Sequence, residues 1–172
     1  MTTTVVGGRR LWLRLLEPND ANLLRRFFSR LSSESVYRRF MAPINAPSNA
    51  LVARLVDIDH CDREALIALD ERGIVGVARY GTVGATHDVA VVVADDWQGR
   101  GVGALLLRRL ANIARARGIR QFHATVLGDN RRAQLLVLGL SPTTKIRFEA
   151  GYVEADIPLK SGGNLSELPA GV

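Results

Sequence analysis

The chain has 172 residues, a length that suits one domain with a substantial hydrophobic core, and no apolar run is long enough to span a membrane. Its single cysteine, Cys61, excludes an internal disulfide and favours a reducing, cytoplasmic location, and residues 1–8 lack the residue order of a signal peptide. The formal net charge is +6, but the arginines form scattered pairs without interleaved aromatic residues, which argues against nucleic-acid binding.

The first half of the chain reads as a strand, several helices and a hairpin. We expect flexible termini at residues 1–8 and 161–172 around a single domain of residues 9–160. Apolar residues alternate or recur at helical spacing in the segments between. These patterns predict a strand over 11–16, helices near 23–31, 32–40 and 51–57, and hairpin strands over 65–69 and 74–80.

The second half alternates strands and helices. A valine-rich strand, residues 88–94, precedes a helix over 101–117 that Gly118 closes. The buried stripe of this helix is predicted to be Leu105, Leu106, Leu110 and Ile113. The remaining elements are a strand over 120–127, a helix from Asn130 to Gly139, and hairpin strands over 143–148 and 152–159. This order predicts an α/β or α+β domain with a mixed central sheet flanked by helices.

The string Gln98-Gly99-Arg100-Gly101-Val102-Gly103 lies between the valine strand and the long helix. Glycines let an anion approach the backbone, and the first N–H groups of a helix are unpaired donors near its positive end. Such a loop is typical of a phosphate or pyrophosphate site, although the glycines could simply form a tight turn. The Gly-Lys-Ser/Thr ending of a P-loop is absent, and the glycine spacing differs from that of a dinucleotide-binding fold.

The same string resembles the Gln/Arg-x-x-Gly-x-Gly/Ala motif of the GCN5-related N-acetyltransferases (GNAT), which holds the pyrophosphate of acetyl-CoA. Asp95-Asp96-Trp97 before it and Asn130 at the start of the next helix are also similar to that family. The resemblance covers about residues 11–159 and implies a mostly antiparallel sheet with one splayed strand pair that holds the cofactor. It implies cofactor contacts by Val91, Val92, Val93, Gln98, Gly99, Arg100, Gly101, Val102, Gly103, Ala104 and Asn130.

Within the family, residues 31–40 and 91–101 resemble the acetyltransferase domain of Pat-type protein lysine acetyltransferases. Those relatives usually carry a cyclic-nucleotide-binding or acyl-CoA-synthetase-like domain as well, and neither is present in this sequence. The arginine-rich helices within residues 19–57 would flank the acceptor cleft and meet the acceptor protein. The resemblance also allows a homodimer.

Acetyl transfer to an amine requires a base, because a lysine-type amine has a pKa of about 10.4. Asp88 stands where Pat-type relatives usually carry a glutamate, so the resemblance makes Asp88 the catalytic base, directly or through a water; alternatively it is a solvated residue at a strand end. His87 beside it must point to the opposite face. His123 is the weaker candidate, and Val137 stands where many relatives have the tyrosine that protonates the leaving thiolate. Tyr37 and Tyr80 are possible substitutes for that tyrosine.

These observations predict an acetyl-CoA-dependent N-acetyltransferase without a metal, which transfers acetyl directly to a protein lysine. A lone Cys-His pair at residues 60–61 is not a metal site. Two alternatives stay open at this point. One is a small amine as the acceptor, and the other is a CoA-binding sensor with little catalysis, which the shortened Asp88 and Val137 would suit.

Overall fold

The computed structural model describes residues 1–44 and 47–159. Its strands are, in chain order, β1 (Thr2–Val6), β2 (Arg9–Leu15), β3 (Arg63–Asp70), β4 (Gly73–Val83), β5 (Thr86–Val93), β6 (Gln121–Leu127), β7 (Lys145–Glu149) and β8 (Tyr152–Pro158). Its α-helices are α1 (Ala21–Ser29), α2 (Ser33–Phe40), α3 (Asn49–Val56), α4 (Val102–Ala116) and α5 (Arg131–Leu138). The short 3₁₀ turns η1 (Pro18–Asp20) and η2 (Asp95–Trp97) precede α1 and α4.

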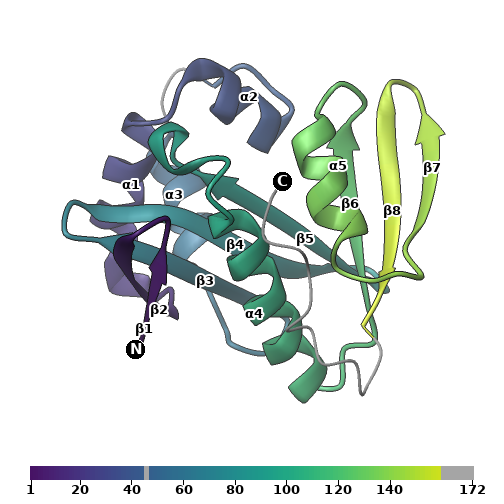
Figure 1. Ribbon diagram of the computed structural model, residues 1–172, viewed down its shortest axis with the longest axis horizontal. Coiled ribbons are helices and arrows are strands. Elements are labelled where there is room, and N and C mark those ends of the chain that lie inside the picture. Colours follow the sequence, from purple (N-terminus) through teal and green to yellow (C-terminus); the bar gives the residue numbers. More distant parts are fainter. Residues whose placement is uncertain (45–46, 160–172) are drawn as a thin grey trace.

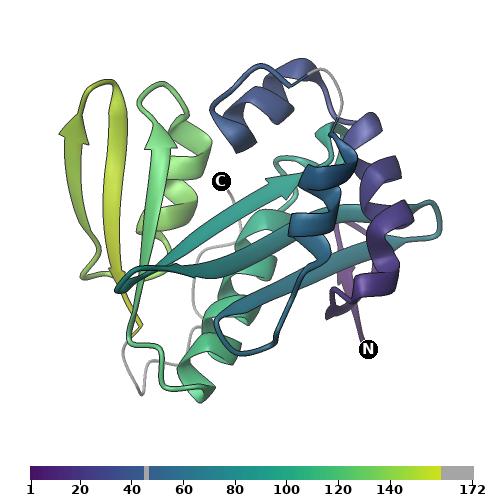
Figure 2. The same ribbon diagram turned by 180° about the vertical axis from the view of Figure 1, so that it is seen from behind.

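The eight strands form one sheet in the order β1-β2-β3-β4-β5-β6-β8-β7. All neighbouring pairs are antiparallel except β5 and β6, which are parallel because α4 connects them. The predicted mixed, mostly antiparallel sheet is therefore confirmed. Helices α4 and α5 cover one face of the sheet, while α1 and α3 cover the other (Figures 1 and 2).

Short polar side chains start several of the helices. Ser32 accepts a hydrogen bond from the Ser35 N–H at the start of α2, and Ser48 accepts one from Leu51 at the start of α3. Gly118 follows α4 with a φ of +85°, a conformation that favours glycine, so the predicted end of this helix is correct.

Two details of the sequence-based prediction are wrong. Residues 2–6 are not a flexible end, because they form β1 and pair with β2 from Thr2 opposite Leu13 to Val6 opposite Arg9. Most of this strand is exposed, so hydrophobic alternation gave no signal, although its β-branched residues favour a strand. The buried stripe of α4 is also rotated slightly and consists of Val102, Gly103, Leu106, Leu107, Leu110, Ala111 and Ala114. The C-terminal segment, residues 161–172, lies outside the described residues.

None of the helices in the described part of the chain is both long and apolar enough to cross a membrane.

Candidate active site

Strands β5 and β6 meet at one point and then separate. Asp88 on β5 lies opposite His123 on β6, and this is the single residue pair in the ladder between the two strands. Toward their carboxyl ends the strands diverge, as Figures 1 and 2 show. The backbone of residues 91–93 therefore has β4 on one side and no paired strand on the other. An exposed strand edge of this kind can hydrogen-bond to an extended ligand.

The glycines of the loop after β5 meet two different requirements. Gly99 and Gly101 have φ values of +71° and +87°, where an L side chain is strained, and a Cβ at either position would meet nothing within 4 Å. At Gly103 the limit is packing, because a Cβ there would lie 3.2 Å from Leu136 Cδ1 and 3.6 Å from Val93 Cγ2. Two glycines thus bend the loop, and the third lets α4 lie close to its neighbours.

The bent loop presents the N-terminus of α4 to the surface. Gly101 is the N-cap and supplies no side chain, so the N–H groups of Val102, Gly103 and Ala104 begin the helix without intrahelical partners. The positive end of the helix dipole adds to them. Arg100 and Arg132 are both exposed beside the loop, with Arg100 Nε donating to the Asp96 carbonyl at 3.1 Å. This combination suits a phosphate or pyrophosphate group.

A polar network fixes the loop to α2. Asp95 accepts hydrogen bonds from the backbone N–H of Ser32 at 2.9 Å, from the Ser32 hydroxyl at 2.7 Å and from the Ser35 hydroxyl at 2.8 Å. Although partial burial raises the pKa of the Asp95 carboxyl, these hydrogen bonds outweigh it and hold the pKa below its ordinary value. Gln98 Nε2 donates to Ser35 Oγ at 2.9 Å and to the Val93 carbonyl at 3.1 Å. Gln98 therefore joins β5, the loop and α2.

We call the diverging strands β5 and β6 the fork. Asp88 lies at its closed end, where the two strands meet, on the face of the sheet covered by α1 and α3. It is exposed, and Thr86 Oγ1 donates to its carboxylate at 3.2 Å. Alternate residues of a strand point to the same face, so the side chain of Asp88 lies on the same face as those of Ala90 and Val92. Val92 lines a pocket with Leu24 of α1, which identifies this face. His87 points to the other face, where its ring meets the Tyr80 ring edge-on at 6.3 Å. The two neighbours are thus separated as strand geometry requires.

His123 is held between two carboxylates of β8. Its Nδ1 lies 3.0 Å from Asp156 Oδ1, and its Nε2 lies 2.8 Å from Glu154 Oε2. Burial alone lowers the pKa of His123, but the hydrogen bonds to Asp156 and Glu154 and the nearby charges of Glu154 and Asp88 raise it above its ordinary value. Both ring nitrogens of His123 are hydrogen-bonded to carboxylates, so neither is available to accept a proton from the amine. Sequence reasoning had no means of finding this cluster, because His123 on β6 and the two carboxylates on β8 are 31 and 33 residues apart in the chain.

The residues considered for protonating the thiolate have other surroundings. Tyr80 is fully buried, and its hydroxyl accepts from Arg117 at 2.9 Å and lies 3.3 Å from the Cys61 carbonyl; burial raises its pKa. Tyr80 is therefore a core residue. Val137 is also buried, whereas Tyr37 on α2 is 45% exposed.

Asn130 and Glu64 have structural partners. The Asn130 side chain accepts from the Ala133 N–H at 3.2 Å and so caps α5, which is a sufficient reason for asparagine there. Glu64 is completely buried, and its carboxylate bonds to Arg117 at 2.6 Å and to His60 at 3.1 Å, a network that the sequence analysis missed. Among the described residues, no group of three or more His, Cys, Asp or Glu side chains is arranged to hold a metal ion.

Comparison with known proteins gives the site its context. The model of the acetyltransferase (GNAT) family matches residues 34–138, more than half of the chain. The chain belongs to the GNAT family. It is accordingly an acetyl-CoA-dependent acetyltransferase.

Three relatives show which members of the GNAT family this chain resembles. The chain is 35% identical over 139 residues to acetyltransferase PA5475 of Pseudomonas aeruginosa, covering 77% of this chain and 75% of that protein. It is 30% identical over 158 residues to acetyltransferase Pat of Mycolicibacterium smegmatis, covering 88% of this chain but 47% of Pat, so it spans about half of that relative. The crystal structure of the GNAT domain of S. lividans PAT superposes with a TM-score of 0.84 at 32% identity, covering 91% of this chain and 96% of that one. The predicted closeness to Pat-type acetyltransferases is thus confirmed.

Proposed function

We propose that this GNAT acetyltransferase transfers an acetyl group from acetyl-CoA directly to the side-chain amine of a protein lysine. The observation that carries the proposal is the fork between β5 and β6, with an anion-binding loop at its open end and a carboxylate, Asp88, at its closed end. The similarity to Pat and to the GNAT domain of PAT supports a protein acceptor. The single cysteine supports a cytoplasmic setting.

The residues at the open end suit the two halves of the cofactor. The N–H groups of Val102, Gly103 and Ala104, with Arg100, would hold the pyrophosphate, and the edge of residues 91–93 that faces away from β4, where no strand is paired, would bind the pantetheine arm. Bound acetyl-CoA supplies the thioester whose acetyl group is transferred. A backbone N–H at this edge would also donate to the thioester carbonyl oxygen, where negative charge develops.

At the closed end of the fork, where β5 and β6 meet, side chains would attract and deprotonate the acceptor amine. Asp88 would accept the proton of the ammonium group, directly or through one water molecule. The carboxylates of Glu154 and Asp156 lie on the same face as Asp88 and His123, since paired residues of neighbouring strands share a face. Glu154 and Asp156 already pair with His123, and Asp156 also pairs with Arg147, so the charge of Asp88 would be the main attraction for a cationic amine.

Release of the CoA thiol in the presence of candidate acceptors tests this function. Acceptor proteins, led by an acyl-CoA synthetase, are compared with a panel of small amines. Release with proteins supports the proposal, whereas release with small amines alone would retain the enzyme class and reject the protein acceptor.

Asp88→Asn tests the base. We expect kcat/KM to fall by about 10²–10⁴-fold near neutral pH, with the deficit shrinking as the pH approaches the amine pKa of about 10.4. Asp62→Asn, at an exposed aspartate outside the fork, is the matched control and should leave the rate unchanged. An unaltered pH–rate profile in Asp88→Asn would show that Asp88 is not the base.

A further inference from the structure

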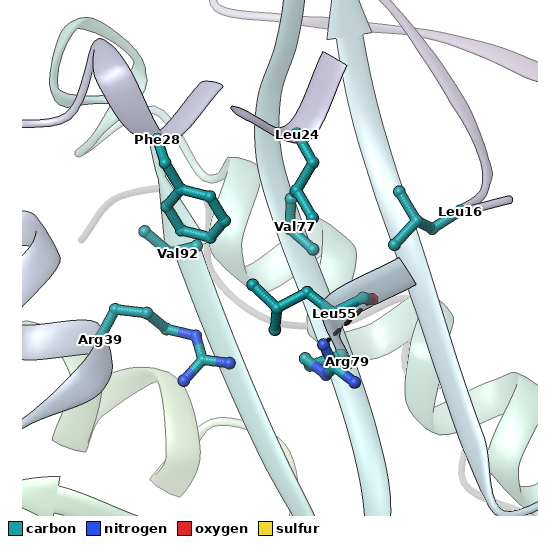
Figure 3. Close-up of a pocket in the computed structure, with 8 residues that line it drawn as sticks. All are labelled: Leu16, Leu24, Phe28, Arg39, Leu55, Val77, Arg79 and Val92. Carbon is teal, nitrogen blue, oxygen red and sulfur yellow. Dashed lines mark hydrogen bonds between the residues drawn. The ribbon is translucent and has the colours of Figure 1, made fainter. Parts of the chain in front are cut away.

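Two arginines that form no salt bridge within the described part of the chain line one pocket on the proposed acceptor face of the sheet. Arg39 reaches in from α2, and Arg79 extends from β4 beneath Leu55 (Figure 3). The other lining side chains are apolar, among them Phe28 and Val92. We refer to this site, with Arg39 and Arg79 as its charged members, as the cationic pocket. Its volume of about 10 Å³ is enough for roughly one oxygen-sized group.

The guanidinium groups of the cationic pocket have unused hydrogen-bonding capacity. Arg79 Nη1 donates to the Leu55 carbonyl at 3.2 Å, and the Arg39 guanidinium lies over the Phe40 ring at 4.9 Å from its centre. Within residues 1–44 and 47–159, no carboxylate forms a salt bridge with either arginine. Each guanidinium carries five N–H donors, so most of them are free to bind an anion.

The electrostatic cost of this arrangement is visible in both groups. Burial lowers the pKa of Arg39 to about 10, with a further contribution from the charge of Arg79. Burial also lowers the pKa of Arg79, and the charges of Arg54 and Arg63 add to the effect. Partly buried like charges without a counter-ion are unfavourable, and an incoming carboxylate would relieve the repulsion.

The cationic pocket lies close to the proposed base. Arg79 pairs with Ala90 across β4 and β5, and Asp88 is two residues farther along β5 on the same face. Such diagonal neighbours are separated by about 7–8 Å between their Cα atoms. In an extended peptide, residues one or two positions apart have Cα atoms about 3.8–6.8 Å apart. The lengths of the lysine and acidic side chains add to this distance, so one peptide can reach both Asp88 and the cationic pocket.

We propose that Arg39 and Arg79 bind a carboxylate of the acceptor, so that the enzyme prefers an amine that carries an acidic group nearby. In a protein acceptor this group is an aspartate or glutamate one or two residues from the lysine. The face then has an acidic end at Asp88 and a basic end at the cationic pocket, which orients the acceptor by its own two charges. This inference rests on the proposed function, because it takes Asp88 to mark the amine.

The test compares acceptor peptides that differ only in Glu or Gln at positions one and two residues on either side of a lysine. We expect the wild type to prefer one Glu peptide by at least about tenfold in kcat/KM, the effect of one charge-assisted hydrogen bond. Arg39→Met and Arg79→Met should remove this preference and leave the Gln peptides within a few-fold of wild type. Arg38→Met is the matched control, since Arg38 is the neighbour on α2 that pairs with Glu34 at 2.6 Å, and it should keep the preference.

Other outcomes separate this inference from the proposed function. Equal rates for Glu and Gln peptides in the wild type, or a preference that survives both variants, would overturn the cationic pocket as an acceptor subsite. If only small amines are acetylated, the proposal of a protein acceptor is wrong. The cationic pocket is then tested by comparing the acetylation rates of ε-aminocaproate and its carboxamide, in place of the Glu and Gln peptides. If no acceptor reacts, thermal unfolding in acetate and in chloride at equal ionic strength decides. Acetate should stabilise the wild type and Arg38→Met but not Arg79→Met, and no such difference would refute the site.

Discussion

Replacing Gly101 by alanine separates backbone strain from cofactor binding. Gly101 has a φ of +87°, and a Cβ added there meets nothing within 4 Å, so the cost comes from the backbone conformation alone. That conformation costs an L-residue about 1–2 kcal/mol. For a chain of this size, 1 kcal/mol lowers Tm by about 2–4 °C, which gives an expected decrease of about 2–8 °C.

Gly118 provides an unusually close control at the other end of α4. Its φ is +85°, and its added Cβ also meets nothing within 4 Å, so Gly118→Ala should lower Tm by a similar amount. The two positions differ in that Gly101 belongs to the loop proposed to bind the pyrophosphate. A Cβ at Gly101 would extend from the surface that the pyrophosphate must approach, and we expect at least about a tenfold loss of acetyl-CoA affinity, or 1.4 kcal/mol.

Calorimetric titration with acetyl-CoA and thermal unfolding measure both effects. Gly118→Ala should bind acetyl-CoA as the wild type does, while Gly101→Ala should bind weakly despite a comparable Tm. Equal affinity in the two variants would refute the assignment of the loop as a phosphate cradle. A much lower Tm for Gly101→Ala than for Gly118→Ala would refute the strain argument.

Three further predictions follow from the polar networks. The pKa of His123 is raised in the folded protein, so its charged form adds to the free energy of unfolding. This contribution is complete below the ordinary pKa of about 6.5 and is lost as the pH rises through the folded-state pKa. His123→Gln should therefore lower the urea concentration at the midpoint of unfolding more at about pH 5.5 than at about pH 9. Asp20 behaves in the opposite way, since the hydrogen bond from Arg14 lowers its pKa. Asp20→Asn should cost about 1.5–3 kcal/mol at neutral pH, and the difference should vanish as the pH falls through the lowered pKa of the folded-state carboxyl. Asp95→Ala should release the start of α2, seen as faster amide exchange in residues 33–40, whereas unchanged exchange would contradict the bracing role of Asp95.

Most helices and strands could be predicted because the spacing of apolar residues within a segment favours one type of secondary structure. The periodic apolar residues of α1 and α4, the continuous apolar runs of β3 and β4, and the turn before β4 all follow from residues near one another in the chain. Strand β1 was missed because an exposed edge strand buries little apolar surface, so its pattern is weak. Its order comes from hydrogen bonds to β2.

In the candidate site, the glycine loop could be predicted from local sequence, since positive φ at Gly99 and Gly101 is a local requirement that glycine meets. Local sequence also determined the capping side chains of α2, α3 and α5. Three features of the site depend on the packed fold: the face of β5 that carries Asp88, the position of His123 opposite it, and the pocket that Arg39 and Arg79 share. These contacts join residues tens of positions apart, and their geometry depends on strand register and helix docking, which are fixed only when the whole core packs.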